Sequence, residues 1–151
     1  MLKVNAEFDL KDLYKEIDDF TDEVEEHMLS SLRQAGKQFV DRARSKVKGV
    51  PFSGAGFGNI TWDLRGSIGY VIVKNHHIIE RYFPFIGLGD EGTKQGHAYA
   101  EEVALLIDEG DIMLIVVAGM DYAYYVEAKG YDVISGSSDH FETEFLKILG
   151  R

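Results

Sequence analysis

The segment that decides the fold is residues 10–47, which read LKDLYKEIDDFTDEVEEHMLSSLRQAGKQFVDRARSKV. Asp9 precedes it as a candidate N-cap, and Gly49 and Pro51 follow it as helix-stop signals. Apolar side chains recur at every third or fourth position, which is the spacing of one helical face: Leu10, Leu13, Ile17, Phe20, Val24, Met28, Leu32, Ala35, Phe39, Ala43 and Val47. The pattern predicts one long N-terminal helix.

The predicted helix is long for the domain to which it belongs. At 1.5 Å per residue it measures roughly 55–60 Å if it is unbroken, whereas a small domain is about 30 Å across. Two arrangements remain open. The helix kinks near Ser30 and Ser31 or near Gly36, or it protrudes and its apolar face meets another subunit.

Charge is polarised along this helix and its flanking residues. Residues 1–30 carry ten acidic and three basic side chains, net −7, and residues 31–50 carry six basic and one acidic side chain, net +5. Acids near the start and bases near the end of a helix complement its dipole, so a solvated outer face accounts for the pattern. Head-to-tail electrostatic pairing between neighbouring copies is the alternative.

The rest of the chain alternates strands with helices. Apolar patterns predict a short strand at 4–8, two strand pairs and a short extended stretch at 131–134; the pairs are 68–73 with 77–82 and 111–119 with 122–128. Helices are predicted at 62–67, from Ser137 or Ser138 onward, and at 94–109 with an apolar side of Tyr99, Val103, Leu106 and Ile107. Neighbouring strands favour an α+β fold, an antiparallel sheet with the long N-terminal helix and one or two further helices packed on one face.

Composition excludes several classes of protein. The chain has 151 residues, 45% of them hydrophobic, so we expect a single domain over residues 1–151. A net charge of −10 argues against nucleic-acid and anionic-lipid partners, and no apolar run has the ~20 residues of a membrane span. The N-terminus lacks the apolar core of a signal peptide. Without cysteine, a disulfide scaffold and a cysteine nucleophile are excluded.

Motifs for catalysis or cofactor binding are weak. Gly87–Gly92 matches the dinucleotide pattern G-x-G-x-x-G, but Asp90 and Glu91 within it would repel phosphate and no parallel βαβ unit surrounds it. Gly54–Gly58 lacks the Lys-Ser/Thr of a P-loop, and no two histidines have the helical spacing of a metal site. We therefore expect no catalytic residue, no cofactor, no metal and no enzymatic activity.

Tyrosine is concentrated in one predicted strand. Tyr122, Tyr124 and Tyr125 fall within four positions, with Tyr122 and Tyr124 on one face of the strand and Tyr125 on the other. Packing of the strand, with hydroxyls at its solvent edge, accounts for this cluster. A contact surface is the alternative, because tyrosine is enriched at protein interfaces.

Three short motifs occur in order along the chain: Ala43–Pro51 (ARSKVKGVP), Thr61–Ile68 (TWDLRGSI) and Tyr122–Gly130 (YAYYVEAKG). In sequence and order they resemble the tail-component family of tailed bacteriophages and prophages. Residues 84–110 are an insertion relative to that family. The side chains that match the second and third family motifs are Thr61, Leu64, Arg65, Ser67, Ile68, Tyr122, Ala123, Val126, Glu127 and Gly130.

The resemblance implies a structural tail-completion, neck or head–tail joining protein without enzymatic activity. Such a protein would assemble with copies of itself, as a ring, and with other virion proteins. It would reside in the cytoplasm of the bacterial host before it joins the virion. A small cytoplasmic protein-binding module is the alternative.

Two sets of side chains are candidates for the assembly interface: Arg42, Arg44 and Lys46 near the end of the long helix, and Tyr122, Tyr124, Tyr125 and Glu127 in the predicted strand. Association through these residues should weaken as salt rises. Reversing the three bases to glutamate should weaken association and leave the fold intact, because exposed charges contribute little folding stability. Arg65 is expected to pair with an acid, and Glu127 is its candidate partner.

Overall fold

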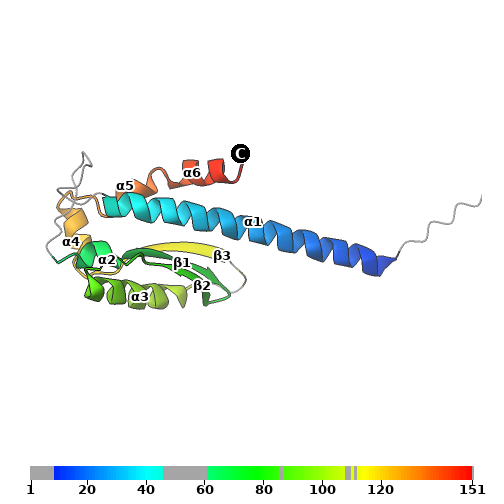
Figure 1. Cartoon of the computed structure of the whole chain (residues 1–151), viewed down its shortest axis with the longest axis horizontal. Helices are drawn as coiled ribbons and strands as arrows, with labels where there is room; N and C mark the ends of the chain where they lie inside the picture. The colour runs from blue at the N-terminus through cyan, green and yellow to red at the C-terminus, as the bar shows by residue number, and fades with distance from the viewer. Residues whose placement is uncertain (1–8, 46–60, 86, 108–109, 111, 151) are drawn as a thin grey trace, which may run out of the picture.

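The computed structural model describes residues 9–45, 61–85, 87–107, 110 and 112–150. The predicted strand at 4–8 and the glycine-rich stretch Gly54–Gly58 lie outside these residues. The described part of the chain has the predicted α+β fold, with elements in this order (Figure 1): α1 (Leu10–Ser45), α2 (Asp63–Ser67), β1 (Ile68–Lys74), β2 (His77–Tyr82), α3 (Asp90–Ala104), β3 (Ile112–Ala118), α4 (Ala123–Ala128), α5 (Ser135–Ser138) and α6 (Phe141–Ile148).

The three strands form one antiparallel sheet with β1 at its centre, in the order β2-β1-β3. A two-residue turn joins β1 to β2, and its residues Asn75 and His76 have positive φ angles of 52° and 64°. Turns with two positive φ angles match the twist of a hairpin. The predicted hairpin is therefore confirmed, and so is the strand predicted at 111–119, which is β3.

Helices cover both faces of the sheet, so the prediction of helices on one face is wrong. Ile68 and Ile72 of β1 pack in the cluster that includes α1, whereas Val71 and Val73 pack in the cluster that includes α3. Figure 1 shows α1 and α3 on opposite sides of the sheet. Every residue of β1 from Ile68 to Val73 is buried, and a central strand of this kind needs cover on both faces.

Helix α1 runs unbroken for 36 residues and protrudes from the rest of the molecule (Figure 1). All of its buried residues lie from Ser31 onward, among them Phe39 and Val40 of the core. Of the two arrangements that the sequence leaves open, the structure has the protruding helix. We call residues 10–28 the arm, and six large apolar side chains along it are exposed: Leu10, Tyr14, Ile17, Phe20, Val24 and Met28.

Helix α3 packs through small side chains; of the large ones predicted, Ile107 packs against the same core cluster, from beyond the end of the helix. The helix begins and ends earlier than the predicted 94–109, at Asp90 and Ala104. Leu106, assigned to the apolar side by its spacing, is 81% exposed beyond the end of the helix. The buried residues of α3 recur at four-residue spacing and let its backbone approach α2 and the sheet closely: Gly92, Gly96, Ala100 and Ala104.

The segment 122–128 is helical, so its prediction as a fourth strand is wrong. Helix α4 directs Ala123 and Val126, three positions apart, toward the core. Gly130, with φ of 84°, ends the helix. The amides of Gly130 and Tyr131 donate back to carbonyls of the last turn at 2.9 and 3.2 Å, which is the Schellman arrangement.

The C-terminal residues form α5 and α6, which lie along α1 (Figure 1). Phe141 of α6 meets Phe39 of α1 edge to face, with ring centroids 6.0 Å apart. The stretch predicted as extended, 131–134, forms no strand. Among the described helices, none is both long and apolar enough to cross a membrane.

Candidate interaction surface

The second and third sequence motifs meet at the end of the molecule opposite the tip of the arm (Figure 1). Ala123 of α4 packs in the same core cluster as Leu64 of α2. Burial raises the pKa of the Tyr122 phenol, while hydrogen bonds with the Thr61 side chain and the Leu64 backbone oppose that rise. Tyr122 thus precedes α4 and lies close to α2 instead of lining a strand face.

Glu127 holds the loop that follows α4. Its Oε1 accepts hydrogen bonds from the amides of Val133, Ile134 and Ser135 at 2.7–3.0 Å, and its Oε2 accepts the Ser135 hydroxyl at 2.5 Å. Burial alone would raise the pKa of Glu127, but these hydrogen bonds outweigh it and hold the pKa below its ordinary value. The carboxylate is therefore engaged within the chain.

Replacing Glu127 by glutamine should destabilise the chain in a pH-dependent way. Because the folded-state pKa is lowered, Glu127 contributes stability above its unfolded pKa and loses it as pH falls through the folded pKa. We expect the free energy of unfolding of Glu127→Gln to be about 1–2 kcal/mol below that of the wild type at pH 7. This difference should become smaller below about pH 4. Urea unfolding of both proteins between pH 7 and pH 3 measures the difference. A difference that stays constant with pH would contradict this prediction.

Arg44 lies in the interior, so its prediction as an exposed charge is wrong. It is 3% exposed, and its guanidinium donates to the carbonyls of Ile68 at 2.7 and 2.9 Å, Gly66 at 3.0 Å, and Pro84. Burial, reinforced by the nearby Arg65 cation, lowers the pKa of Arg44 to about 10, so it stays charged at neutral pH. Reversal to glutamate would direct a carboxylate at these carbonyl oxygens and would not spare the fold.

Other bases of α1 also have partners within the chain. Arg42 forms an ion pair with Glu144 of α6, and Arg33 forms one with Glu80 of β2 at 2.6 Å. Lys46 lies outside the described residues. These intrachain pairs leave fewer charges for head-to-tail pairing between copies.

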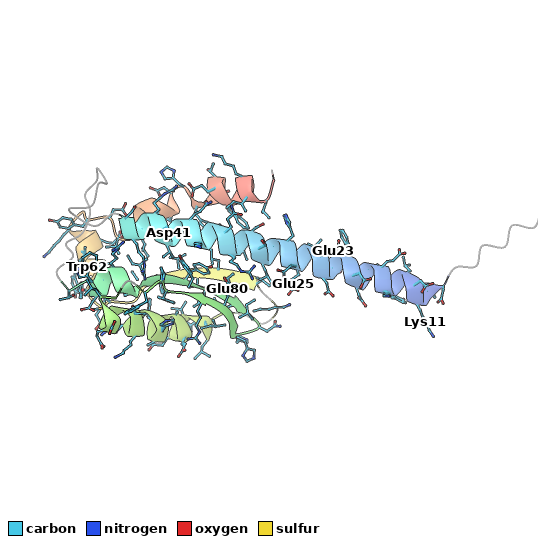
Figure 2. All side chains as sticks on the ribbon, viewed as in Figure 1. Lys11, Glu23, Glu25, Asp41, Trp62 and Glu80 are labelled. Carbon is cyan, nitrogen blue, oxygen red and sulfur yellow. The ribbon has the colours of Figure 1, made fainter. Side chains whose placement is uncertain are left out.

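Arg65 does not take the partner predicted for it. Its Nε donates to the carbonyl of Arg44 at 3.1 Å, and its guanidinium lies over the ring of Trp62, 5.4 Å from the centroid. Trp62 is labelled in Figure 2 at the end of the molecule where α2 lies. Since Glu127 directs its oxygens at residues 133–135, the predicted pairing of Arg65 with Glu127 is wrong.

Two tyrosines of α4 form an exposed aromatic patch. Tyr124 and Tyr125 are 77% and 67% exposed, and their rings meet edge to face with centroids 5.9 Å apart. Beside Tyr124 lies a mostly apolar cavity of about 540 Å³, bounded by α3, β3, α4 and the loop at 133–135. Tyr99 of α3, which was not predicted as an interface residue, lines the same cavity.

The cavity lies beside the edge of the sheet. β3 is an edge strand, and all seven of its residues are apolar. The amide of Gly119 donates to the carbonyl of Ser67 at 3.2 Å, which places the β1 hydrogen bonds on the odd-numbered residues of β3. The main-chain groups of even-numbered residues, such as Val116 and Ala118, consequently point away from β1. An uncharged edge of this kind can accept an extended segment of another chain.

Gly87–Gly92 leads into α3 and packs against α2. The amide of Gly92, in the first turn, donates to Asp63 Oδ1 at 3.2 Å, so a carboxylate of the chain takes the position that a phosphate would need. Within the described ranges, no group of three or more His, Cys, Asp or Glu side chains could hold a metal ion.

Comparison of the chain with protein-family models, with curated proteins and with solved structures finds no match. The resemblance to phage tail components therefore rests on the sequence motifs. In this chain the motif residues have packing roles: Leu64 and Ile68 are buried, the hydroxyl of Ser67 donates to the Leu64 carbonyl at 2.8 Å, and Gly130 ends α4.

Proposed function

We propose that this chain is a structural subunit of a tailed bacteriophage or prophage and catalyses no reaction. It assembles at the neck or the tail end with copies of itself and with other virion proteins. The observation that carries this proposal is the meeting of two family motifs, about 60 residues apart in the sequence, at one end of the molecule.

That end has the features of a contact surface. Tyr124 and Tyr125 offer large aromatic area, and the apolar edge of β3 lies close by. Ala123 and Glu127 fix α4 beneath the tyrosines, so the patch is held in one shape. A ring forms when one face of each subunit meets a different face of the next, and this patch supplies one such face.

A protein-binding module is the second candidate, and the cavity beside Tyr124 favours it. Its volume of about 540 Å³ falls within the usual range of binding pockets. The partner would then be an extended peptide segment of another protein, added to the edge of β3. No virion would depend on the chain.

Deletion of the gene from the phage or prophage that encodes it tests the proposed function. We expect infectious particles to be lost and electron micrographs to show heads and tails that are unjoined or incomplete. A normal yield of intact virions would contradict the virion role.

A matched pair of variants tests whether the tyrosine patch carries this role. A complementing copy with Tyr124→Ser and Tyr125→Ser should fail to restore infectivity. A copy with Leu105→Ser and Leu106→Ser, which are 72% and 81% exposed, should restore it. Both copies should fold, because substitutions at exposed positions usually cost little stability. If both copies restore infectivity equally well, the tyrosine patch is not part of the assembly surface.

A further inference from the structure

The arm carries an apolar face that the chain itself does not cover. Six large side chains along it are exposed, from Leu10 at 57% to Met28 at 40%. Farther along α1 the same stripe is covered, since Phe39 packs against Phe141 of α6. Isolated exposed apolar residues are common, but a continuous row of this length marks an interaction site.

The spacing of the stripe changes at Val24, within the exposed arm and before the buried part of α1 begins at Ser31. From Leu10 to Val24 the apolar positions follow steps of three, four, three and four residues, an average of 3.5. From Val24 to Ala43 the steps are four, four, three, four and four, an average of 3.8. A repeat of 3.5 residues keeps side chains facing a partner helix in a left-handed coiled coil. Residues 10–24 of the arm therefore have the spacing of a helix that pairs with another helix.

The orientation of that partner helix follows from α6. This helix lies on the same stripe of α1 and runs back along it, so that α6 ends partway along α1 and the arm continues beyond (Figure 1). A parallel helix on the arm would extend into the space that α6 occupies. An antiparallel helix would continue the line of α6 away from the sheet without meeting it.

We infer that the arm pairs with the arm of a second copy of this chain, antiparallel, in a two-fold symmetric contact. With the symmetry axis between Ile17 and Phe20, Ile17 faces Phe20 of the second copy, and Leu13 faces Val24 of the second copy. All four side chains are apolar. The contact does not depend on the proposed virion role, and it joins subunits in pairs whichever faces form a ring.

Charge opposes this pairing and fixes how it responds to salt. Residues 10–28 hold eight acids and two bases, a net charge of −6. Glu16 and Glu23 flank the apolar face and approach each other across an antiparallel pair; Figure 2 labels Glu23 on the arm, between Lys11 near its tip and Glu25 nearer the sheet. Screening shortens from about 10 Å at 0.1 M to about 3 Å at 1 M salt. Association should therefore strengthen with salt, the reverse of what exposed bases at the end of α1 would give.

Sedimentation velocity of the full chain over a range of concentrations, in 0.05 M and 1 M NaCl, tests the pairing. We expect a monomer–dimer equilibrium that is tighter in 1 M salt. Ile17→Gln with Phe20→Gln should weaken it by roughly 100-fold or more. The control is Lys15→Gln with Asp22→Gln, which also leaves the net charge unchanged. Both positions lie on the side of the arm opposite the apolar stripe, so this variant should behave as wild type. A wild type that stays monomeric in both salts would overturn the inference. So would an Ile17→Gln with Phe20→Gln variant that dimerises as well as the wild type.

Two further double variants distinguish the effect of the charges that flank the apolar face from the effect of the net charge of the arm. Glu16→Gln with Glu23→Gln should tighten dimerisation at 0.05 M salt more than Asp18→Asn with Asp22→Asn, because only the first pair faces the partner arm. An equal effect of the two double variants would count against the antiparallel contact.

Cross-linking tests the orientation, because the chain has no cysteine. Leu13→Cys and Val24→Cys chains should form a disulfide when they are mixed under mild oxidation, and Leu13→Cys alone should not. Efficient cross-linking of Leu13→Cys alone would mean parallel arms and would overturn the antiparallel pairing. These results in solution are read independently of the virion assays, so each proposal can fail without the other.

Discussion

Replacing Arg44 by alanine is expected to lower the free energy of unfolding by about 3–5 kcal/mol, because several buried carbonyls lose a charged donor at a cost of about 1–3 kcal/mol each. The guanidinium joins the end of α1 to the carbonyls of Gly66 and Ile68, where α2 becomes β1, and to that of Pro84. One side chain thus fastens three segments that are distant in the sequence. Most domains are stable by only 5–15 kcal/mol, so this variant should be close to unfolded at 37 °C.

Urea unfolding followed by circular dichroism measures this loss, with Arg33→Ala as the matched control. Arg33 lies on the same helix and pairs with Glu80, but its side chain is 46% exposed, so its loss should cost less than about 1 kcal/mol. Arg44→Lys should fall between the two, since a single ammonium cannot reach every carbonyl that the guanidinium spans. Equal stability of the two alanine variants would show that the buried hydrogen bonds contribute little.

The sequence could have indicated the position of Arg44 but not its partners. It lies four residues after Val40, which itself follows Gly36 by four, and all three are buried in one column of α1. If the predicted buried face of α1 had been widened to include this neighbouring column, Arg44 would have been predicted to be buried. The acceptors of Arg44 are main-chain oxygens, and every residue type has one, so the sequence does not indicate which residues accept its hydrogen bonds. Without a visible partner, a run of basic residues is interpreted as a solvent-exposed face.

Periodicity predicted the long elements correctly and failed on a short one. The 36-residue α1 contains ten turns, and β1 with β2 is marked by its turn residues, so in both cases the pattern is repeated often enough to be distinctive. Helix α4 has six residues, fewer than two turns. Over that length the alternation of Tyr122 and Tyr124 is as visible as the three-residue spacing of Ala123 and Val126.

Small residues were the second source of error. The apolar face of α3 was predicted from its large side chains, yet the helix buries Gly92, Gly96, Ala100 and Ala104. A face of this kind gains its contacts from close backbone approach, which hydrophobicity does not register. The signal was present in the sequence as four small residues at strict four-residue spacing.

The apolar edge strand β3 was predicted, but its place at the sheet edge depends on pairing that one strand's sequence does not specify.

Gly92→Ala is the sharpest test of that close approach, and its expected effect has the opposite sign to the usual one. In an exposed helix, alanine in place of glycine stabilises by about 0.5–1 kcal/mol. Here a Cβ on Gly92 would lie 2.6 Å from the Cα of Asp63 and closer still to its carbonyl oxygen. Backbone cannot rotate away as a side chain can, so α2 and α3 must separate, at an expected cost of about 3 kcal/mol or more.

The control for Gly92→Ala is Gly87→Ala, in the loop just before α3. No atom lies within 4 Å of a Cβ placed there, but φ is +79°, so the expected cost is about 1–2 kcal/mol from backbone conformation alone. Thermal and urea unfolding of both variants compare steric overlap with conformational strain in one segment. Because Asp63 also caps the start of α3 through the Gly92 amide, separating the two helices should break that hydrogen bond as well. Gly92→Ala should therefore lose more stability than Gly87→Ala, and a Gly92→Ala protein as stable as wild type would mean that α2 and α3 are not packed backbone to backbone.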